Sequence, residues 1–208
     1  MENILLHPMY FGCIAQYVAK AKAGTVFFEN EDNYQKQTYR NRTYIYGANG
    51  KLSLSIPIKH TGNKEGRQLY KDVKIENDFP WQPQHWKSME AAYRTSPFFE
   101  FYEDELIHLF ESKQEFLLDF NYQCMEAIES CLQMDISFMK TTEFIREPND
   151  MKDLRFLVEA KKEKAYNLET YHQVFADKYG FISNLSILDL LFNEGTNALS
   201  YLEDQNIF

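Results

Sequence analysis

The chain has 208 residues, of which 44% are hydrophobic and 16% aromatic, and its formal net charge at pH 7 is −9. This composition excludes a disordered chain, and the length allows one large domain or two small ones. The acidic balance argues against general nucleic-acid binding, which needs a basic face, but it leaves room for a local basic pocket.

The first thirty residues predict a strand, a helix and a second strand. Residues 3–7 are a short apolar run that Pro8 stops, and apolar residues at helical spacing then run from Tyr10 to a stop at Gly24. Residues 25–28, Thr-Val-Phe-Phe, are typical of a buried strand. We therefore expect a parallel βαβ unit with a right-handed crossover at the start of a central sheet.

The next segment concentrates cations, amides and tyrosines in an otherwise acidic chain. It reads NYQKQTYRNRTYIYGANG and includes Lys36, Arg40 and Arg42. If residues 34–46 are extended, these three cations share one face by the period of two, whereas in a helix Arg42 would leave the face. The tyrosines of the same parity are Tyr34, Tyr44 and Tyr46.

This pattern predicts an anion-binding site. Guanidinium groups bind phosphate or carboxylate through two parallel hydrogen bonds, lysine adds a point charge, and tyrosine rings stack on a base or sugar. The alternative is a solvated hairpin whose cations pair with Glu29, Glu31 and Asp32.

Strand character continues after a turn signal at Asn49–Gly50. Residues 51–59 alternate with the period of a half-buried strand, and Pro57 suggests an edge or a bulge. Residues 60–70 are polar with two glycines and predict a mobile loop, and residues 71–77 predict another short strand.

The second half of the chain predicts mostly helices. Apolar stripes at helical spacing predict helices over about 83–96, 98–111 and 113–133, and residues 135–144 return to strand character. Residues 149–164 predict a charged surface helix.

Taken together, these elements predict an α/β fold. Its central sheet is mostly parallel and begins with the N-terminal βαβ unit, and its second half is largely helical. We expect one domain over residues 1–208, with Leu154 and Leu157 of the charged helix turned inward.

Residues 182–195 predict a further helix near the end of the chain. Ser186 and Asp189 have the spacing of a capping box in which Asp replaces the usual Glu, and Gly195 supplies the stop. A functional interpretation makes Asp189 a general base or a hydroxyl ligand. We favour the helix terminus, because the spacing alone accounts for both residues.

Motif searches exclude several enzyme classes. The chain has no CxxC, no HExxH, no Gly-rich phosphate loop and no GxSxG, and its histidines form no pair at metal-ligand spacing. We predict no metal site, and the sequence leaves any cofactor open.

Two histidines are candidates for proton transfer. His7 follows the first predicted strand, and the carboxyl end of a strand is where open α/β sheets bind ligands. His85 lies between Trp81 and Trp86 near the start of a helix, where it is a candidate general acid or base. The structural alternatives are a histidine that only terminates a strand and a half-buried helix residue.

Targeting signals and cysteines predict a cytoplasmic protein. The N-terminus lacks the basic start and long apolar run of a signal peptide, and no stretch approaches the ~20 apolar residues of a membrane-spanning helix. Cys13, Cys124 and Cys131 are widely spaced, as expected for free thiols in a reducing compartment.

Several of these runs resemble the WbqC-like proteins. The similarity lies in YFG-x-I-x-x-Y, NYQKQTYRNRTYI, GANG-x-LSLSIPI, W-x-x-QHW with AAYRTSPFF, and GF-x-x-NLSILDLLFNEG, and it extends from about residue 5 to about residue 200. The family is largely uncharacterised. Its members occur in bacterial O-antigen and other surface-polysaccharide clusters, and a glycine (aminoacyl) transferase role has been suggested for some.

The resemblance implies an enzyme that transfers an acyl or aminoacyl group to an amino sugar or nucleotide sugar. His85 or His7 would take the proton from the attacking amine. The substrate-binding candidates, which include family motif positions, are Tyr10, Tyr34, Lys36, Arg40, Asn41, Arg42, Tyr44 and Asp189.

Two other functions stay open at this point. One is a non-catalytic binding protein for a phosphorylated carbohydrate or nucleotide, and the other is a nucleotidyltransferase-like enzyme, by analogy with the strand-helix-strand start. In each case the expected partner is a small anionic molecule and not a nucleic acid or a membrane, and the oligomeric state is open.

Overall fold

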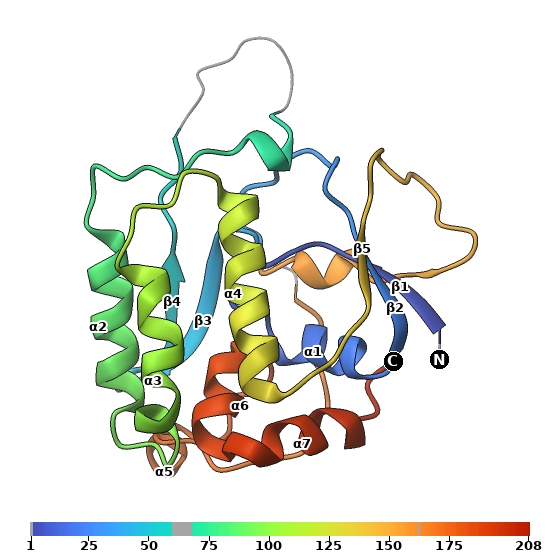
Figure 1. The fold of residues 1–208 in the computed structure, drawn as a ribbon. Coiled ribbons are helices and arrows are strands. Elements are labelled where there is room, and N and C mark those ends of the chain that lie inside the picture. The colour runs from blue at the N-terminus through green and yellow to red at the C-terminus, as the bar shows by residue number, and fades with distance from the viewer. Residues whose placement is uncertain (1, 60–67, 162) are drawn as a thin grey trace.

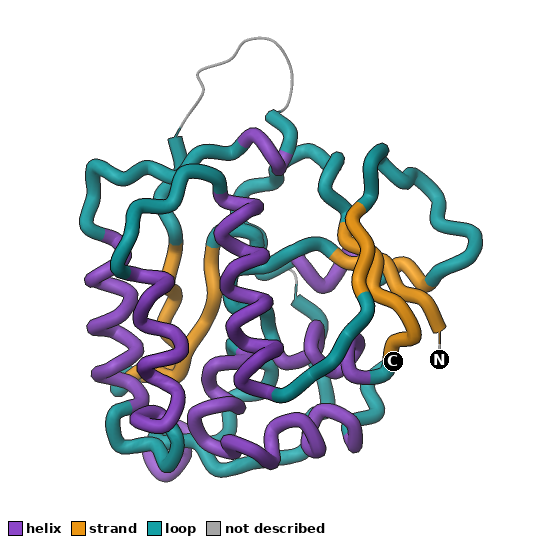
Figure 2. The backbone as a smooth tube through the Cα atoms, viewed as in Figure 1, coloured by secondary structure: helices purple, strands orange, loops and turns teal. Residues whose placement is uncertain are grey.

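The computed structural model describes residues 2–59, 68–161 and 163–208. Within these ranges the chain forms a four-stranded parallel sheet, a separate antiparallel hairpin and a set of helices (Figure 1). Most of the described α-helices come from the second half of the chain, and the sheet lies to one side of them (Figure 2). This arrangement confirms the predicted α/β class.

The N-terminal βαβ unit is present. Strand β1 (Glu2–Leu6) pairs in parallel with β2 (Ala23–Phe28), and α1 (Ile14–Ala21) connects them. Strand β2 begins at Ala23, so Gly24 lies within the strand and does not cap the helix as predicted. Almost all of α1 is buried, because it lies between the sheet and the C-terminal helices.

The order of the strands positions the candidate site. The sheet runs β5 (Phe138–Lys140), β2, β1, β6 (Lys152–Asp153), and every pair is parallel. Counted along the chain, this is the order 3-2-1-4, in which growth of the sheet reverses at β1. Open α/β sheets bind ligands outside the carboxyl ends of the strands at such a switch point, which here lies between β1 and β6.

Two predicted elements are wrong. Residues 149–164 do not form a helix but contain β6 and a short 3-10 helix, Arg155–Val158, although Leu154 and Leu157 are buried as predicted. Pairing with β1, far away in the sequence, determines this segment, and local periodicity cannot reveal such pairing.

Residues 71–77 form no strand. A 3-10 helix at Tyr70–Asp72 is followed by isolated bridges from Lys74 to Phe116 and from Ile75 to Ile58. Of the loop predicted for residues 60–70, residues 60–67 lie outside the described ranges.

The predicted hairpin is present but shorter than expected. Strands β3 (Arg42–Gly47) and β4 (Gly50–Ser55) are antiparallel and close through the two residues between Gly47 and Gly50. Gly50 has a φ of 97°, which glycine adopts without steric cost and which explains the turn signal.

The helices pack on the hairpin and on α1. Helix α2 (Trp81–Tyr93) contacts β3, and α1 contacts α6 (Ile187–Glu194) and α7 (Ala198–Asp204). The other helices are α3 (Phe99–Ile107), α4 (Leu117–Leu132) and α5 (Ala176–Tyr179). Within residues 2–59, 68–161 and 163–208, no helix combines the length and apolar character needed to cross a bilayer.

Half of the predicted capping box at α6 is present. The Ser186 hydroxyl accepts a hydrogen bond from the Leu188 N–H at 3.3 Å, and Gly195 ends the helix at a φ of 56°. Asp189 does not reach back to Ser186. It is fully buried and accepts hydrogen bonds from the hydroxyls of Tyr93 and Tyr171 at 2.8 and 2.5 Å.

Candidate functional site

Polar residues follow the carboxyl ends of all four parallel strands. His7 follows β1, Glu29 follows β2, Thr141 follows β5, and Arg155 lies two residues after the end of β6. The Thr141 hydroxyl donates to the Glu29 carboxylate at 2.8 Å, and Arg155 Nη1 lies 3.5 Å from the other Glu29 oxygen. Because parallel strands end at one edge, these side chains form a single polar cluster.

A cavity of about 420 Å³ opens at this edge, and we name it the switch-point crevice. Phe144 and Phe156 contribute apolar surface to it. Its volume is within the usual range for small-molecule sites. The titratable and charged residues that line it are His7, Asp32, Arg40, Asp153, Arg155 and Glu159.

His7, Arg40 and Asp32 contact one another inside the crevice. Arg40 Nη2 lies 2.9 Å from both His7 Nε2 and Asp32 Oδ2, and these two acceptor atoms are 3.3 Å apart. Since Arg40 donates to Nε2, the imidazole proton belongs on Nδ1, which lies 3.4 Å from the Glu29 carbonyl oxygen. The arrangement keeps an acceptor nitrogen directed at the guanidinium.

The pKa values of the trio are set by burial and by one another. Burial lowers the pKa of His7 to about 4, against the opposing effect of the neighbouring Asp32 carboxylate. Partial burial raises the pKa of Asp32, but the neighbouring His7 side chain and the Arg40 charge outweigh it, so the pKa lies below the ordinary value. At neutral pH the crevice therefore holds an uncharged imidazole beside an ionised carboxylate.

Arg40 has more donors than partners. Its side chain is fully buried, and in the described part of the chain neither Nε nor Nη1 has a hydrogen-bond partner. Burial lowers the pKa of Arg40, yet a guanidinium stays charged at neutral pH. A buried cation with unused donors is costly, and a bound anion would satisfy them.

Arg155 is held in place more completely. Its Nε and Nη2 donate to the two oxygens of Asp153 at 2.9 and 2.6 Å, and Nη1 donates to the Ile145 carbonyl oxygen at 2.5 Å. The bidentate contact to Asp153 raises the pKa of Arg155. Asp153 lines the crevice beside this second guanidinium and balances its charge.

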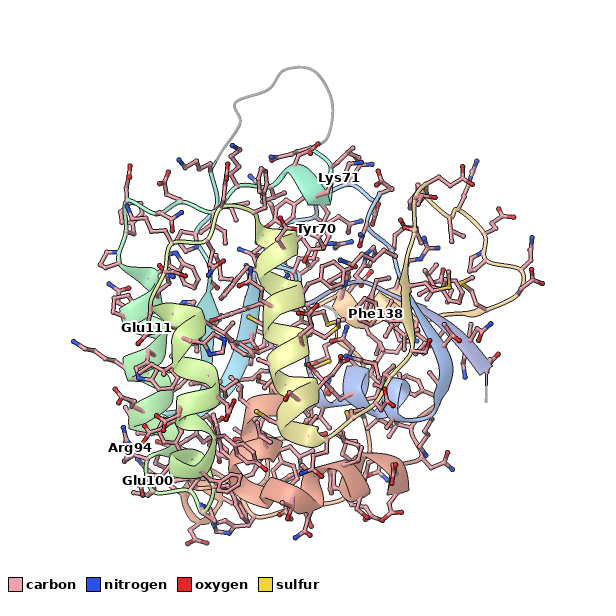
Figure 3. All side chains as sticks on the ribbon, in the orientation of Figure 1. Tyr70, Lys71, Arg94, Glu100, Glu111 and Phe138 are labelled. Carbon is pink, nitrogen blue, oxygen red and sulfur yellow. The ribbon has the colours of Figure 1, made fainter. Side chains whose placement is uncertain are left out.

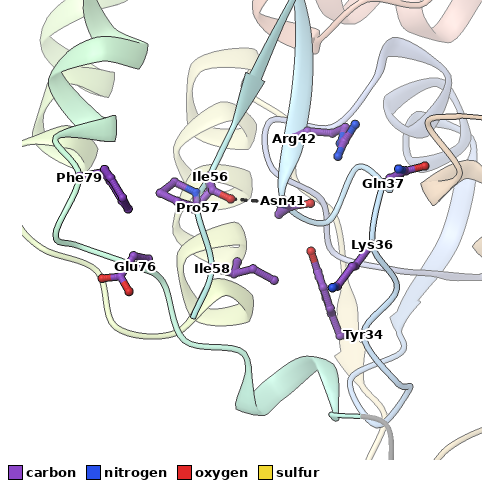
Figure 4. Close-up of a pocket in the computed structure, with 10 residues that line it drawn as sticks. All are labelled: Tyr34, Lys36, Gln37, Asn41, Arg42, Ile56, Pro57, Ile58, Glu76 and Phe79. Atoms are coloured by element: carbon purple, nitrogen blue, oxygen red, sulfur yellow. Dashed lines mark hydrogen bonds between the residues drawn. The ribbon is translucent and has the colours of Figure 1, made fainter. Parts of the chain in front are cut away.

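A second cavity, of about 640 Å³, lies beside the start of β3, and we name it the hairpin cavity (Figure 4). Tyr34, Lys36 and Arg42 line one wall, with Pro57 and Phe79 opposite (Figure 4).

The three predicted cations therefore do not share a face. Arg40 lines the switch-point crevice, whereas Lys36 and Arg42 line the hairpin cavity. The reason is that residues 36–40 are not extended: turns at 36–37, where Gln37 has a φ of 63°, and at 39–40 interrupt the period of two before β3 begins at Arg42. The Arg40–Asp32 pair matches the alternative interpretation, but it is buried and not solvated.

Comparison with known proteins identifies the chain. The model of the WbqC-like protein family matches residues 7–168, which include every described residue that lines either cavity. The chain belongs to the WbqC-like protein family. No curated protein and no solved structure shows significant similarity to it.

The structure of this WbqC-like protein places His85 in the core. The His85 Nδ1 and the Tyr10 hydroxyl lie 2.9 Å apart, both residues are buried, and neither lines the crevice or the hairpin cavity. Burial lowers the pKa of His85 to about 4. His7 is therefore the better-placed histidine for proton transfer.

Three other candidates differ in their positions. Asn41 lines the hairpin cavity, and its amide donates to the Ile56 carbonyl oxygen at 3.0 Å. Tyr44 lines neither cavity and packs edge-on against Tyr39 at a centroid distance of 5.8 Å. Asp189 belongs to the buried hydroxyl network of α6.

Sequence patterns did not reveal Asp153 and Arg155 of this WbqC-like protein, and they indicated Asp32 only as a partner of solvated cations. The rule that selected His7 applies to the end of every parallel strand. The same rule selects Asp153 and Arg155 once residues 152–153 are known to form strand β6. Within the described ranges, no group of three or more His, Cys, Asp or Glu side chains is arranged to hold a metal ion.

The buried histidines predict a pH-dependent stability. Their folded pKa values of about 4 lie below the ordinary 6.5, so the unfolded chain takes up the protons first as pH falls. Stability is then fully present above pH 6.5 and is lost toward pH 4. Between pH 7.5 and 5.5 each histidine should cost about 1.4 kcal/mol.

Urea unfolding at these two pH values measures the effect. His7→Gln and His85→Gln should each remove about half of the loss, and His108→Gln, at an exposed position, should remove none. An unchanged pH dependence in both buried variants would contradict the assignment.

Proposed function

We propose that this WbqC-like protein is a cytoplasmic transferase of bacterial surface-polysaccharide biosynthesis. It transfers an acyl or aminoacyl group, of the glycine type, to the amine of an amino sugar or nucleotide sugar. The observation that carries the proposal is the switch-point crevice, which combines the uncharged imidazole of His7 with the guanidinium groups of Arg40 and Arg155. The buried free thiols of Cys13 and Cys124 support a reducing compartment.

The crevice supplies the groups that this reaction needs. The amine nitrogen attacks the acyl carbonyl carbon, so that a C–N bond forms and the donor's C–O or C–S bond breaks. His7 Nε2 accepts the proton that the amine loses and returns it to the leaving oxygen or sulfur. Arg40 and Arg155 bind the phosphate or carboxylate of the donor.

Binding of the donor and activation of His7 are coupled in this proposal. Without ligand, Arg40 Nη2 is hydrogen-bonded to His7 Nε2. An anion that engages the unused Nε and Nη1 donors competes for the guanidinium and frees Nε2 for the amine proton. Asp32 remains beside the imidazole and stabilises its protonated form.

Arg40→Met tests the anion-binding role. Methionine retains the buried stem but leaves the Asp32 carboxylate without its partner, so the melting temperature of the free variant should fall, and the ligand-induced shift is measured from each protein's own ligand-free melting temperature. Thermal shift with acyl-coenzyme A thioesters and a non-hydrolysable glycyl-adenylate analogue measures binding. A donor at a hundred times its Kd stabilises the wild type by about 2.7 kcal/mol, and the variant should lose this gain.

Arg94→Met is the matched control. Arg94 lies at the surface at the end of α2 and pairs with Glu90 and Glu103 (Figure 3). It should keep the full ligand-induced shift. Equal shifts in both variants, or no shift with any donor in the wild type, would refute the proposed transferase.

A non-catalytic binding protein for a phosphorylated carbohydrate or nucleotide is the second candidate. The burial of His7 favours this candidate, because the residue is only 3% exposed and its Nε2 lies between Arg40 and Asp32. Such a protein would bind the anion through Arg40 and show no turnover.

A further inference from the structure

The hairpin cavity contains charge that the proposed chemistry does not use. Lys36 is exposed and Arg42 half-buried, and within the described ranges neither forms an ion pair or a side-chain hydrogen bond. Glu76 lines the cavity too, but its carboxylate accepts a hydrogen bond from the Asp78 N–H at 3.1 Å. The cavity thus has two available cations in a chain whose net charge is −9.

A buried polar group in the same wall lacks a partner. Asn41 is 8% exposed and donates through Nδ2 to the Ile56 carbonyl oxygen, but within the described part of the chain its Oδ1 accepts no hydrogen bond. Arg42 Nε is also buried without a partner there. The wall therefore offers cationic donors next to a free acceptor, as a ligand with both phosphate and hydroxyl groups requires.

Ring surfaces face these groups. Phe79 is 64% exposed and lies with Pro57 across the cavity from Arg42 (Figure 4). Burial raises the pKa of Tyr34 to about 12, against the opposing charges of Arg42 and Arg40, so its hydroxyl stays protonated at neutral pH. Exposed aromatic rings beside cations suit a flat heterocycle attached to phosphate.

A smaller cavity of about 210 Å³ shares lining residues with both larger ones. Lys36 and Gln37 also line the hairpin cavity, and Gln35 and Glu159 also line the switch-point crevice. The segment 35–38 therefore borders both cavities.

We propose that the hairpin cavity is a second substrate site, which binds a nucleoside diphosphate group. Lys36 and Arg42 bind the diphosphate, Phe79 and Pro57 cover the base, and Asn41 Oδ1 accepts from a ligand hydroxyl or N–H group. The identification of this second substrate as a nucleotide sugar rests on the proposed function. The nucleotide sugar then binds in the hairpin cavity, and the acyl donor binds in the switch-point crevice. The sugar then extends along residues 35–38 toward the crevice that contains His7.

Isothermal titration calorimetry of the full chain with uridine diphosphate tests the site. The wild type should bind, and Arg42→Gln and Lys36→Gln should each weaken binding about tenfold or more, the value of one charge-assisted hydrogen bond. Arg40→Met, in the crevice, should stay within about twofold of the wild type. Inorganic pyrophosphate should bind about fivefold or more weakly than uridine diphosphate, because it has no ring to stack.

The outcomes separate this site from the proposed reaction. Loss of uridine diphosphate binding in the Lys36 and Arg42 variants supports the site, whether or not an acyl donor binds. Failure of every acyl donor to bind would contradict only the proposed transferase. An equal loss in Arg40→Met overturns the division into two sites. Absence of binding in the wild type, or wild-type affinity in both cavity variants, overturns the site itself. Lys36 is exposed, so its variant folds independently of the contact tested.

Discussion

Replacement of His7 by Gln should lower the rate of acyl transfer by about 10²–10⁴-fold, the usual contribution of a positioned base. Glutamine fills the site and can hydrogen-bond to Arg40, but it cannot take up the amine proton. In the proposed reaction the acyl donor binds to Arg40 and Arg155, so its binding should change little. Steady-state kinetics should therefore show a loss in kcat with a nearly unchanged KM.

His85→Gln is the control for this experiment. It makes the same chemical change at a buried histidine that lies outside the crevice, so the folded fraction should retain its kcat. The pH profile gives a second readout, because the wild type should lose activity as His7 becomes protonated and the variant should not. If His85→Gln loses turnover while His7→Gln retains it, the base is His85 and the assignment made here is wrong.

Replacement of Glu129 by Gln should destabilise the protein by about 3–5 kcal/mol, the cost of leaving a buried charge without its partner. Glu129 of α4 forms an ion pair with Lys20 of α1, whose side chain is only 1% exposed. Burial lowers the pKa of Lys20, and the Glu129 charge opposes that shift. The Lys20 ammonium also lies 4.4 Å from the centroid of the Tyr17 ring.

Chemical unfolding at pH 7 measures this loss. Glu126→Gln removes the same charge from an exposed position on the same helix and should change stability by less than about 0.5 kcal/mol. A double variant with Lys20→Met and Glu129→Leu should recover most of the loss, because it removes both charges together. If Glu129→Gln and Glu126→Gln are equally stable, the pair does not stabilise the fold.

Local patterns were sufficient for the elements whose stabilising interactions are local. The β1-α1-β2 unit and the helices of the middle region follow from apolar periodicity, and the Asn49–Gly50 turn follows from the positive φ that Gly50 adopts. Ser186 caps α6 as its spacing predicts. His7 could also be placed, because a strand end in a parallel sheet is a ligand position in any such fold.

The composition of the candidate site depended on long-range pairing. Strand β6 has only two residues, and its pairing with β1 brings Asp153 and Arg155 to His7. A two-residue strand is too short to show a periodicity that would predict its pairing with β1. The turn at residues 39–40 likewise separates Arg40 from Arg42, which alternation alone placed on one face.

The sequence by itself determined the class of fold, the family and the presence of a basic aromatic segment near the first turn. Only the tertiary structure decided that this segment divides two cavities and that Asp189 belongs to the core. The physical reason is that local propensity acts over a few neighbouring residues, whereas a ligand site is assembled from strand ends and loops that meet only after the sheet has formed.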